Sequence, residues 1–155
     1  MEIMTRVILT TIGHLSHDLI SLSTGTYEAL GGSSAYVSLI LAKFNVKVGL
    51  VTKVGKDFKK EYFNLLEKSE IDLKGFKMIN GKTTSFKNVY TDGDRRQFLI
   101  SLCKKIRLND VPEGYFESKI LHFGPIFKEI SYNLIKEANK RGVNVALDVQ
   151  GFCRG

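Results

Sequence analysis

Polar side chains and glycines follow the predicted strands of this chain, at the positions where a layered α/β sheet binds its ligands. Asp18 comes shortly after the first predicted strand, and the segment 31–34 (Gly-Gly-Ser-Ser) precedes a predicted helix. An ionised carboxylate accepts several hydrogen bonds, so Asp18 is suited to bind the vicinal hydroxyls of a small molecule. The glycines let a ligand approach the backbone, and the first helical amides are free donors. A tight turn and nothing more explains Gly-Gly before a helix equally well.

Other motifs for phosphate, metal or nucleophilic chemistry fail on their spacing. No G-x-G-x-x-G follows a strand, and the segment 49–56 differs from a P-loop by one extra residue between its glycines. His14, His17 and Asp18 form an H-x-x-H-D cluster without a further ligand triad, so we expect no metal site. Cys103 lies on a predicted strand with no obvious histidine partner, which argues against a cysteine nucleophile.

The composition is that of one globular domain. The chain has 155 residues, of which 43% are hydrophobic and 25% charged, and these values exclude a disordered or low-complexity protein. The net charge of +7 suggests anionic partners, with nucleic acid among them. The basic residues are scattered, however, and no run of five or six occurs. We therefore expect no nucleic-acid binding, although a basic nucleic-acid-binding domain is a third alternative for the function.

Cysteine content and hydropathy predict the compartment. The 2 cysteines do not make a disulfide framework. The first six residues lack the basic and apolar regions of a signal peptide, and no apolar run approaches the length of a membrane helix. We expect a reduced, cytoplasmic protein that does not bind a membrane.

Helical and strand patterns alternate along the chain, which favours an α/β fold with a mostly parallel sheet. Strands are predicted over the apolar, β-branched segments 6–12, 46–54, 75–79, 120–123 and 143–147. Helical spacing of apolar residues predicts three helices, the first with Val37, Ile40, Leu41 and Phe44, the second after Asp57 as N-cap, and the third with Phe127, Ile130, Leu134 and Ala138.

Two further segments do not fit a series of β-α-β units. Residues 19–30 predict a short hairpin, and 84–102 predict a second one that turns at Asp92-Gly93. Together they predict an extra antiparallel sheet over one edge of the main sheet.

Five segments in order resemble landmarks of the ribokinase or PfkB carbohydrate kinases. The segment 30–38 resembles the first signature of that family, and 55–58 resembles its V-G-x-D-x-F stretch. The other three are 13–18, 120–124 and 145–154. The resemblance implies a ribokinase-like three-layer α/β/α fold in which residues 1–155 form the substrate-binding part. It also implies a small β-sheet lid made of segments near 19–30 and 84–102.

The resemblance also implies the site residues. Substrate would contact Ser16, Asp18, Gly31, Gly32, Ser33 and Tyr36. The lid residues Phe86, Tyr90 and Phe98 would close over it and exclude water. Asp148 and Arg154 would approach the phosphates or metal-bound waters. Tyr36 departs from the family pattern, which places asparagine there, so the substrate differs from ribose; the branch most similar is that of the inositol kinases.

The family function implied is that of an ATP-dependent, Mg²⁺-requiring kinase that phosphorylates a hydroxyl of a sugar, polyol or nucleoside. The catalytic aspartate of the family lies in a D-T-x-G-A-G-D signature, and nothing in these 155 residues matches it. We therefore expect the nucleotide-binding part to be absent, with no catalytic residue in this chain and no activity of the fragment alone. A non-catalytic, truncated sugar-binding or polyol-binding protein is the alternative. Pairing of lids between subunits makes a homodimer plausible.

Overall fold

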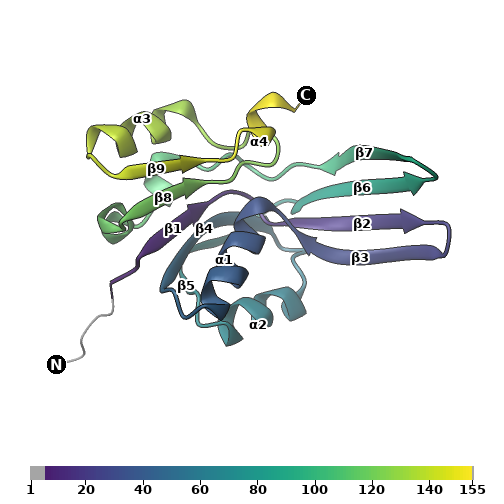
Figure 1. Cartoon of the computed structure of the whole chain (residues 1–155), viewed down its shortest axis with the longest axis horizontal. Coiled ribbons are helices and arrows are strands. Elements are labelled where there is room, and N and C mark those ends of the chain that lie inside the picture. Colours follow the sequence, from purple (N-terminus) through teal and green to yellow (C-terminus); the bar gives the residue numbers. More distant parts are fainter. Residues whose placement is uncertain (1–5, 155) are drawn as a thin grey trace.

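The computed structural model describes residues 6–154, so most of the N-terminal segment assessed for a signal peptide lies outside the described residues. Its main sheet has five parallel strands, β5 (Asp72–Ile79), β4 (Val48–Gly55), β1 (Leu9–Ile12), β8 (Ile120–Phe123) and β9 (Asn144–Leu147), in that spatial order. The predicted strands are confirmed, with shifted ends. β1 is the central strand, so its carboxyl end lies at the middle of the sheet edge that the carboxyl ends form (Figure 1).

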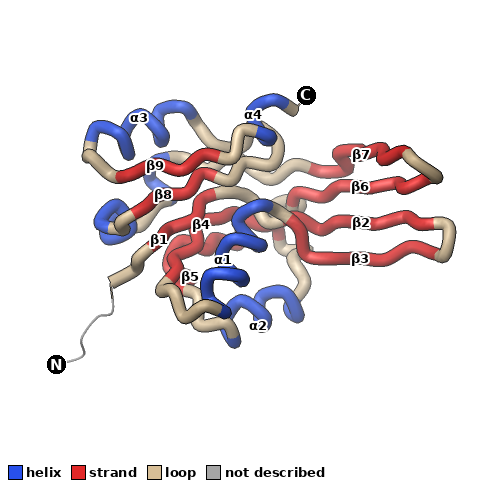
Figure 2. Tube along the Cα trace, in the orientation of Figure 1, coloured by secondary structure: helices blue, strands red, loops and turns tan. Residues whose placement is uncertain are grey.

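Helices cover both faces of this sheet, which confirms the predicted three layers (Figure 2). The helices are α1 (Ser33–Lys43), α2 (Lys60–Lys68), α3 (Tyr132–Lys140) and the short α4 (Gln150–Cys153). Neighbouring side chains of a strand point to opposite faces. Leu50 of β4 accordingly packs in the core below α1 and α2, and Val51 packs in the core with Leu134 of α3. No helix in the described part of the chain is long and apolar enough to cross a membrane.

The two predicted hairpins form a second sheet, which we call the lid. It contains β3 (Gly25–Gly31), β2 (Ser16–Leu22), β6 (Thr84–Thr91) and β7 (Asp94–Ser101), and it projects from the main sheet (Figure 1). Each of the two hairpins is antiparallel, as predicted. The pairing that joins them is parallel, between β2 and β6, and this corrects the expectation of an all-antiparallel sheet. Both strands leave the main sheet at the same edge, so they run in the same direction.

A network of polar side chains fixes the root of the lid, and its members His14, Thr83 and Thr84 are buried. The imidazole of His14 bonds the Thr84 hydroxyl through Nδ1 at 2.8 Å and the Lys104 carbonyl through Nε2 at 3.0 Å. Burial lowers the pKa of His14, so the ring is neutral and donates from Nε2. Asp57, predicted to cap the second helix, instead accepts two hydrogen bonds from Thr83, each 2.8 Å. These hydrogen bonds connect the start of β6 to the segments that directly follow β1 and β4.

The third helix begins later than its apolar spacing predicts. It starts at Tyr132, although Phe127 and Ile130 were expected on it. The side chain of Glu129 is fully buried and accepts hydrogen bonds from the backbone amides of Ile126, Phe127 and His14, at 2.8–3.1 Å. These bonds hold the chain in a loop, and Lys128 takes a positive φ of 53° that is incompatible with a helix.

Glu129→Gln is expected to lower the free energy of unfolding by about 2 kcal/mol, because both carboxylate oxygens accept from buried N–H donors and the NH2 group that replaces one of them cannot accept. Chemical denaturation of the chain measures this change. Glu67→Gln, an exposed position on α2, makes the same charge change and is the control, with an expected effect within about 0.5 kcal/mol. Equal stability of the two variants would contradict the role given to the Glu129 carboxylate.

Candidate functional site

A polar cavity of about 240 Å³ lies between the lid, the start of α1 and the region of α4. We call it the lid cavity. It lies beyond the carboxyl end of β1, where open α/β sheets bind their ligands. Eight residues that the sequence singled out line it: Ser16, Asp18, Gly32, Ser33, Tyr36, Phe86, Tyr90 and Arg154. The fold thus brings together residues that are up to 138 positions apart in the sequence (154 − 16).

Asp18 is a central polar group of the lid cavity. Its Oδ1 accepts a hydrogen bond from the Ser16 hydroxyl at 2.8 Å, and both residues lie on β2 and point to the same face. Gly31, which pairs with Ser16 across β2 and β3, makes room for them. A Cβ at Gly31 would lie 2.6 Å from Ser16 Oγ and would overlap Asp18 Oδ2. Gly31 therefore contributes by leaving space for the carboxylate and does not itself line the cavity.

The electrostatics of Asp18 combine burial with nearby cations. Burial raises the pKa of Asp18, while the hydrogen bond from Ser16 and the charges of Arg95 and Arg154 oppose this rise. Burial also raises the pKa of Tyr36 at the rim, and the carboxylate of Asp18 adds to the effect. The Tyr36 hydroxyl is therefore a neutral group that donates or accepts a hydrogen bond at neutral pH.

Asp148 lies beside the lid cavity and is connected to it through Ser33. The Ser33 hydroxyl donates to Asp148 Oδ2 at 2.6 Å, and the side chain of Gln150 donates to both groups at 3.0 and 3.1 Å. Partial burial acts to raise the pKa of Asp148, but the hydrogen bonds from Ser33 and Gln150 outweigh it and lower the pKa. Asp148 is therefore ionised at neutral pH, next to the first turn of α1.

Arg154 is held against the wall of the cavity. Its Nη1 donates to the Ile126 carbonyl at 3.2 Å and its Nη2 donates to Gln150 Oε1 at 2.8 Å. Its guanidinium lies 5.8 Å from the centre of the Phe86 ring, a cation–π distance. The charge of Arg154 is thereby directed at the cavity that contains Asp18.

The lid residues divide between the two faces of the lid. Phe86 is buried against Phe127 and lines the cavity together with Tyr90. Phe98 does not line it, which corrects the expectation that it closes over a ligand. It pairs with Lys87, one residue out of phase with Phe86, and side chains alternate between the faces of a strand. Phe98 is consequently 50% exposed on the outer face.

Sequence reasoning missed half of the polar lining contributed by the lid. Asn88, Arg95 and Gln97 line the cavity, and Gln150 contributes from α4. A signal for the first three was present. Asn88 is two residues from Phe86 and therefore on the same face, and the Asp92-Gly93 turn sets Arg95 and Gln97 opposite Tyr90 and Asn88. The sequence did not show which face of the lid is turned toward the ligand, so this register alone could not assign these three side chains to the site.

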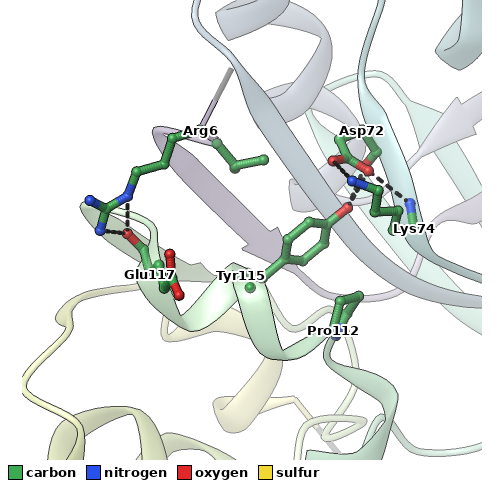
Figure 3. A pocket seen from close by; sticks show the side chains of 8 residues that line it. Arg6, Asp72, Lys74, Pro112, Tyr115 and Glu117 are labelled. Atoms are coloured by element: carbon green, nitrogen blue, oxygen red, sulfur yellow. Dashed lines mark hydrogen bonds and ion pairs between the residues drawn. The ribbon is translucent and has the colours of Figure 1, made fainter. Parts of the chain in front are cut away.

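A larger cavity, of about 410 Å³, lies at the other end of the main sheet (Figure 3). Its polar groups are occupied by structural contacts, since Tyr115 donates to the backbone and the side chain of Asp72 and Arg6 donates to the Glu117 carbonyl. Burial and the bond to Asp72 raise the pKa of Tyr115 far above its ordinary value. Because this cavity lies at the amino ends of β1 and β5, the lid cavity is the better candidate for a functional site.

The lid cavity is equipped to bind and orient a polar molecule. Asp18 offers a charged acceptor, Tyr36 and Ser33 offer hydroxyls, and Arg95 and Arg154 add positive charge on two sides. Hydrogen bonds that involve a charged group are roughly twice as strong as neutral ones, so a ring with neighbouring hydroxyls is a fitting ligand for Asp18. Phe86 closes one wall and excludes water from that side.

Comparison with known proteins gives a consistent result. The sequence profile of the pfkB family carbohydrate kinases matches residues 2–149 of this chain. A cytidine kinase of Thermococcus kodakarensis is 31% identical over 140 residues, which cover 88% of this chain and 50% of that protein. A nucleoside kinase of Methanothermobacter thermautotrophicus is 37% identical over 68 residues, which cover 43% of this chain and 22% of that protein.

Among solved structures, a pyrophosphate-dependent kinase in the ribokinase family, complexed with a pyrophosphate analog and myo-inositol, has a TM-score of 0.72 and 25% identity. The match covers 93% of this chain and 50% of that one. This chain therefore spans half the length, or less, of the relatives it matches.

Proposed function

Because this chain belongs to the pfkB family of carbohydrate kinases, we propose that it forms the part of an ATP-dependent kinase that binds the hydroxyl compound to be phosphorylated. The observation that carries this proposal is the partly buried Asp18, fixed by Ser16 at the inner face of the lid and flanked by Arg95 and Arg154. A carboxylate in that position binds two neighbouring hydroxyls and orients a third toward the phosphoryl donor. We call this compound the acceptor.

The acceptor belongs to the class of sugars, polyols and nucleosides. Similar proteins are a cytidine kinase, a nucleoside kinase and a kinase complexed with myo-inositol, and these ligands share vicinal hydroxyls on a ring. Tyr36 stands at the rim of the lid cavity, where its hydroxyl and ring face the bound molecule. We propose that Asp18 holds the hydroxyls while Phe86 and Tyr90 exclude water.

We propose that the phosphoryl donor and Mg²⁺ bind beside Ser33, where Asp148 and Arg154 lie next to the acceptor. Asp148 is ionised and Arg154 is a fixed cation, and this pair suits a metal-bound water and a phosphate oxygen respectively. Mg²⁺, when bound, neutralises charge on the transferred group. We propose that transfer itself needs the D-T-x-G-A-G-D signature of the family, which these 155 residues do not contain.

Calorimetric titration of the chain with cytidine, ribose, fructose and myo-inositol tests acceptor binding. Binding of at least one compound is expected, and silence toward all of them would contradict the proposal. Incubation with Mg²⁺ and either ATP or pyrophosphate tests transfer. Robust turnover by this chain would contradict the need for the missing signature. Turnover with pyrophosphate and not with ATP would show that pyrophosphate is the phosphoryl donor.

Two further expectations from the sequence stay predictions. The cytoplasmic location is one. The other is a homodimer through the lid, which is supported by exposed apolar side chains such as Phe98 and Ile100 on β7, an edge strand of the lid.

A further inference from the structure

Asn88 presents an unpaired donor to the lid cavity from an almost fully buried side chain. It lies on β6, is 2% exposed and lines the cavity. Its Oδ1 accepts hydrogen bonds from Arg95 Nη2 at 3.0 Å and from Gln97 Nε2 at 2.8 Å. A guanidinium only donates, so the atom facing Arg95 must be the amide oxygen. The orientation of the amide is therefore fixed, and Nδ2 has no hydrogen-bond partner in the described part of the chain.

Gln97 supplies the complementary group. Its Nε2 donates to Asn88, which leaves Oε1 as an acceptor without a partner among residues 6–154. Asn88 and Gln97 are directly paired across β6 and β7, so their side chains stand next to each other on the inner face of the lid. The lid therefore offers a donor and an acceptor side by side.

The Nδ2 donor is open to the lid cavity and is not enclosed by protein, since among residues 6–154 the buried side-chain nitrogen without a partner is His17 Nε2. A ligand in the lid cavity is the simplest partner for Nδ2, because the rest of the amide is already engaged. Asn88 is two residues beyond Phe86, which pairs with Asp18, and two residues of strand span about 7 Å. A ring bound by Asp18 through one edge thus meets Asn88 and Gln97 with another edge.

We propose that Asn88 determines acceptor specificity by donating a hydrogen bond from Nδ2 to the acceptor, while Gln97 Oε1 accepts one from it. Arg95 is a positioning residue, because it fixes the amide of Asn88. The chemistry recognised is an adjacent acceptor and donor pair, which a ring hydroxyl of a polyol or the amino-carbonyl edge of a nucleobase provides. This inference rests on the proposed function of the lid cavity as acceptor site.

Asn88→Asp is the decisive variant. It keeps Oδ1 for Arg95 and Gln97 and replaces only the donor by a carboxylate oxygen. The Kd of each probe, cytidine and myo-inositol, is measured calorimetrically for the original chain and the variant. An increase in Kd of at least about 10-fold is expected for the probe that the original chain binds, since one donor is lost and an unpaired acceptor takes its place. A loss for cytidine identifies a base edge as the partner, and a loss for myo-inositol identifies a ring hydroxyl.

Asn133→Asp, at an exposed position on α3, introduces the same charge and is the matched control. An unchanged Kd in Asn88→Asp, or an equal increase in Asn133→Asp, overturns the specificity role and leaves the proposed function standing. If the original chain binds neither these probes nor the sugars, the proposed function and this inference fail together. Should Asn88→Asp fold poorly, Gln97→Met carries the test, because Gln97 is partly exposed and its variant is expected to raise Kd several-fold; an unchanged Kd there also overturns the inference.

Discussion

Asp18→Asn is expected to weaken acceptor binding by at least about 100-fold. Each hydrogen bond to a charged group contributes about 1.5–3 kcal/mol, and the carboxylate has two oxygens for two hydroxyls. Asparagine keeps one acceptor oxygen, now uncharged, and replaces the other by an NH2 group that cannot accept from a hydroxyl. Both hydrogen bonds to the acceptor are therefore weakened or lost. Calorimetric titration with whichever of cytidine, ribose, fructose or myo-inositol binds the original chain measures the loss.

The loss should not come from unfolding. Burial raises the pKa of Asp18, so its ionisation opposes folding at neutral pH, and removal of the charge is not expected to lower the melting temperature. Asp92→Asn, at the exposed tip of the second lid hairpin, makes the same charge change away from the cavity and should bind normally. A Kd of Asp18→Asn within threefold of the original would remove Asp18 from the site.

The same pKa shift gives a pH dependence. The folded chain holds the Asp18 proton more tightly than the unfolded chain does, so the stability that Asp18 provides is present below the unfolded pKa and is lost as pH rises through the folded value. Acceptor binding has the opposite sign, because it requires the ionised carboxylate. Binding by the original chain should therefore weaken on acidification at a higher pH than an ordinary aspartate would cause, and this dependence should be absent in Asp18→Asn.

Gly32→Ala is expected to lower the free energy of unfolding by at least about 3 kcal/mol. Gly32 has a φ of 105° and a ψ of 137°, a conformation that costs other residues free energy. A Cβ there would overlap the carbonyl oxygen of His14 and lie 3.3 Å from the Cα of Leu15. Both contacts are with backbone at the root of the lid, which cannot move without disturbing the His14 network. Urea denaturation measures the change.

Gly114→Ala is the matched control for Gly32→Ala. A Cβ at Gly114 meets nothing within 4 Å, and its φ is not positive, so the variant should be as stable as the original chain or slightly more stable. Equal denaturation midpoints for the two variants would show that the turn at Gly32 tolerates a side chain. A destabilised Gly32→Ala that still binds the acceptor at low temperature would separate folding from recognition at this glycine.

Much of the fold followed from local patterns. Runs of β-branched residues such as 48–54 form strands wherever they are buried on both faces, and the glycines at 31 and 32 stand where a strand must turn sharply into a helix. Asp18 was identified from its place after the first strand and its resemblance to a family landmark. The strands and the turn depend on residues close together in sequence, so they were predicted correctly, and the role of Asp18 stays a prediction.

The features that were missed depend on contacts between distant segments. Glu129 stops the third helix because its carboxylate meets the amide of His14, 115 residues away, and no local pattern records that contact. Asp57 serves Thr83 at the root of β6 instead of capping its own helix. In both cases a carboxylate, buried at Glu129 and exposed at Asp57, accepts hydrogen bonds that outweigh helical propensity, which contributes only about 0.7 kcal/mol per residue or less.

The lid shows most clearly which features the sequence determines and which depend on the tertiary structure. The sequence by itself determined that two hairpins exist and that Phe86, Asn88 and Tyr90 share one face, because side chains alternate along a strand. Only the parallel pairing of β2 with β6 decided that this face is turned toward Asp18 and that Phe98 points away. A shift of that register by one residue would have exchanged the two faces. The chemistry of the lid cavity is therefore set by a contact between strands more than sixty residues apart in the chain.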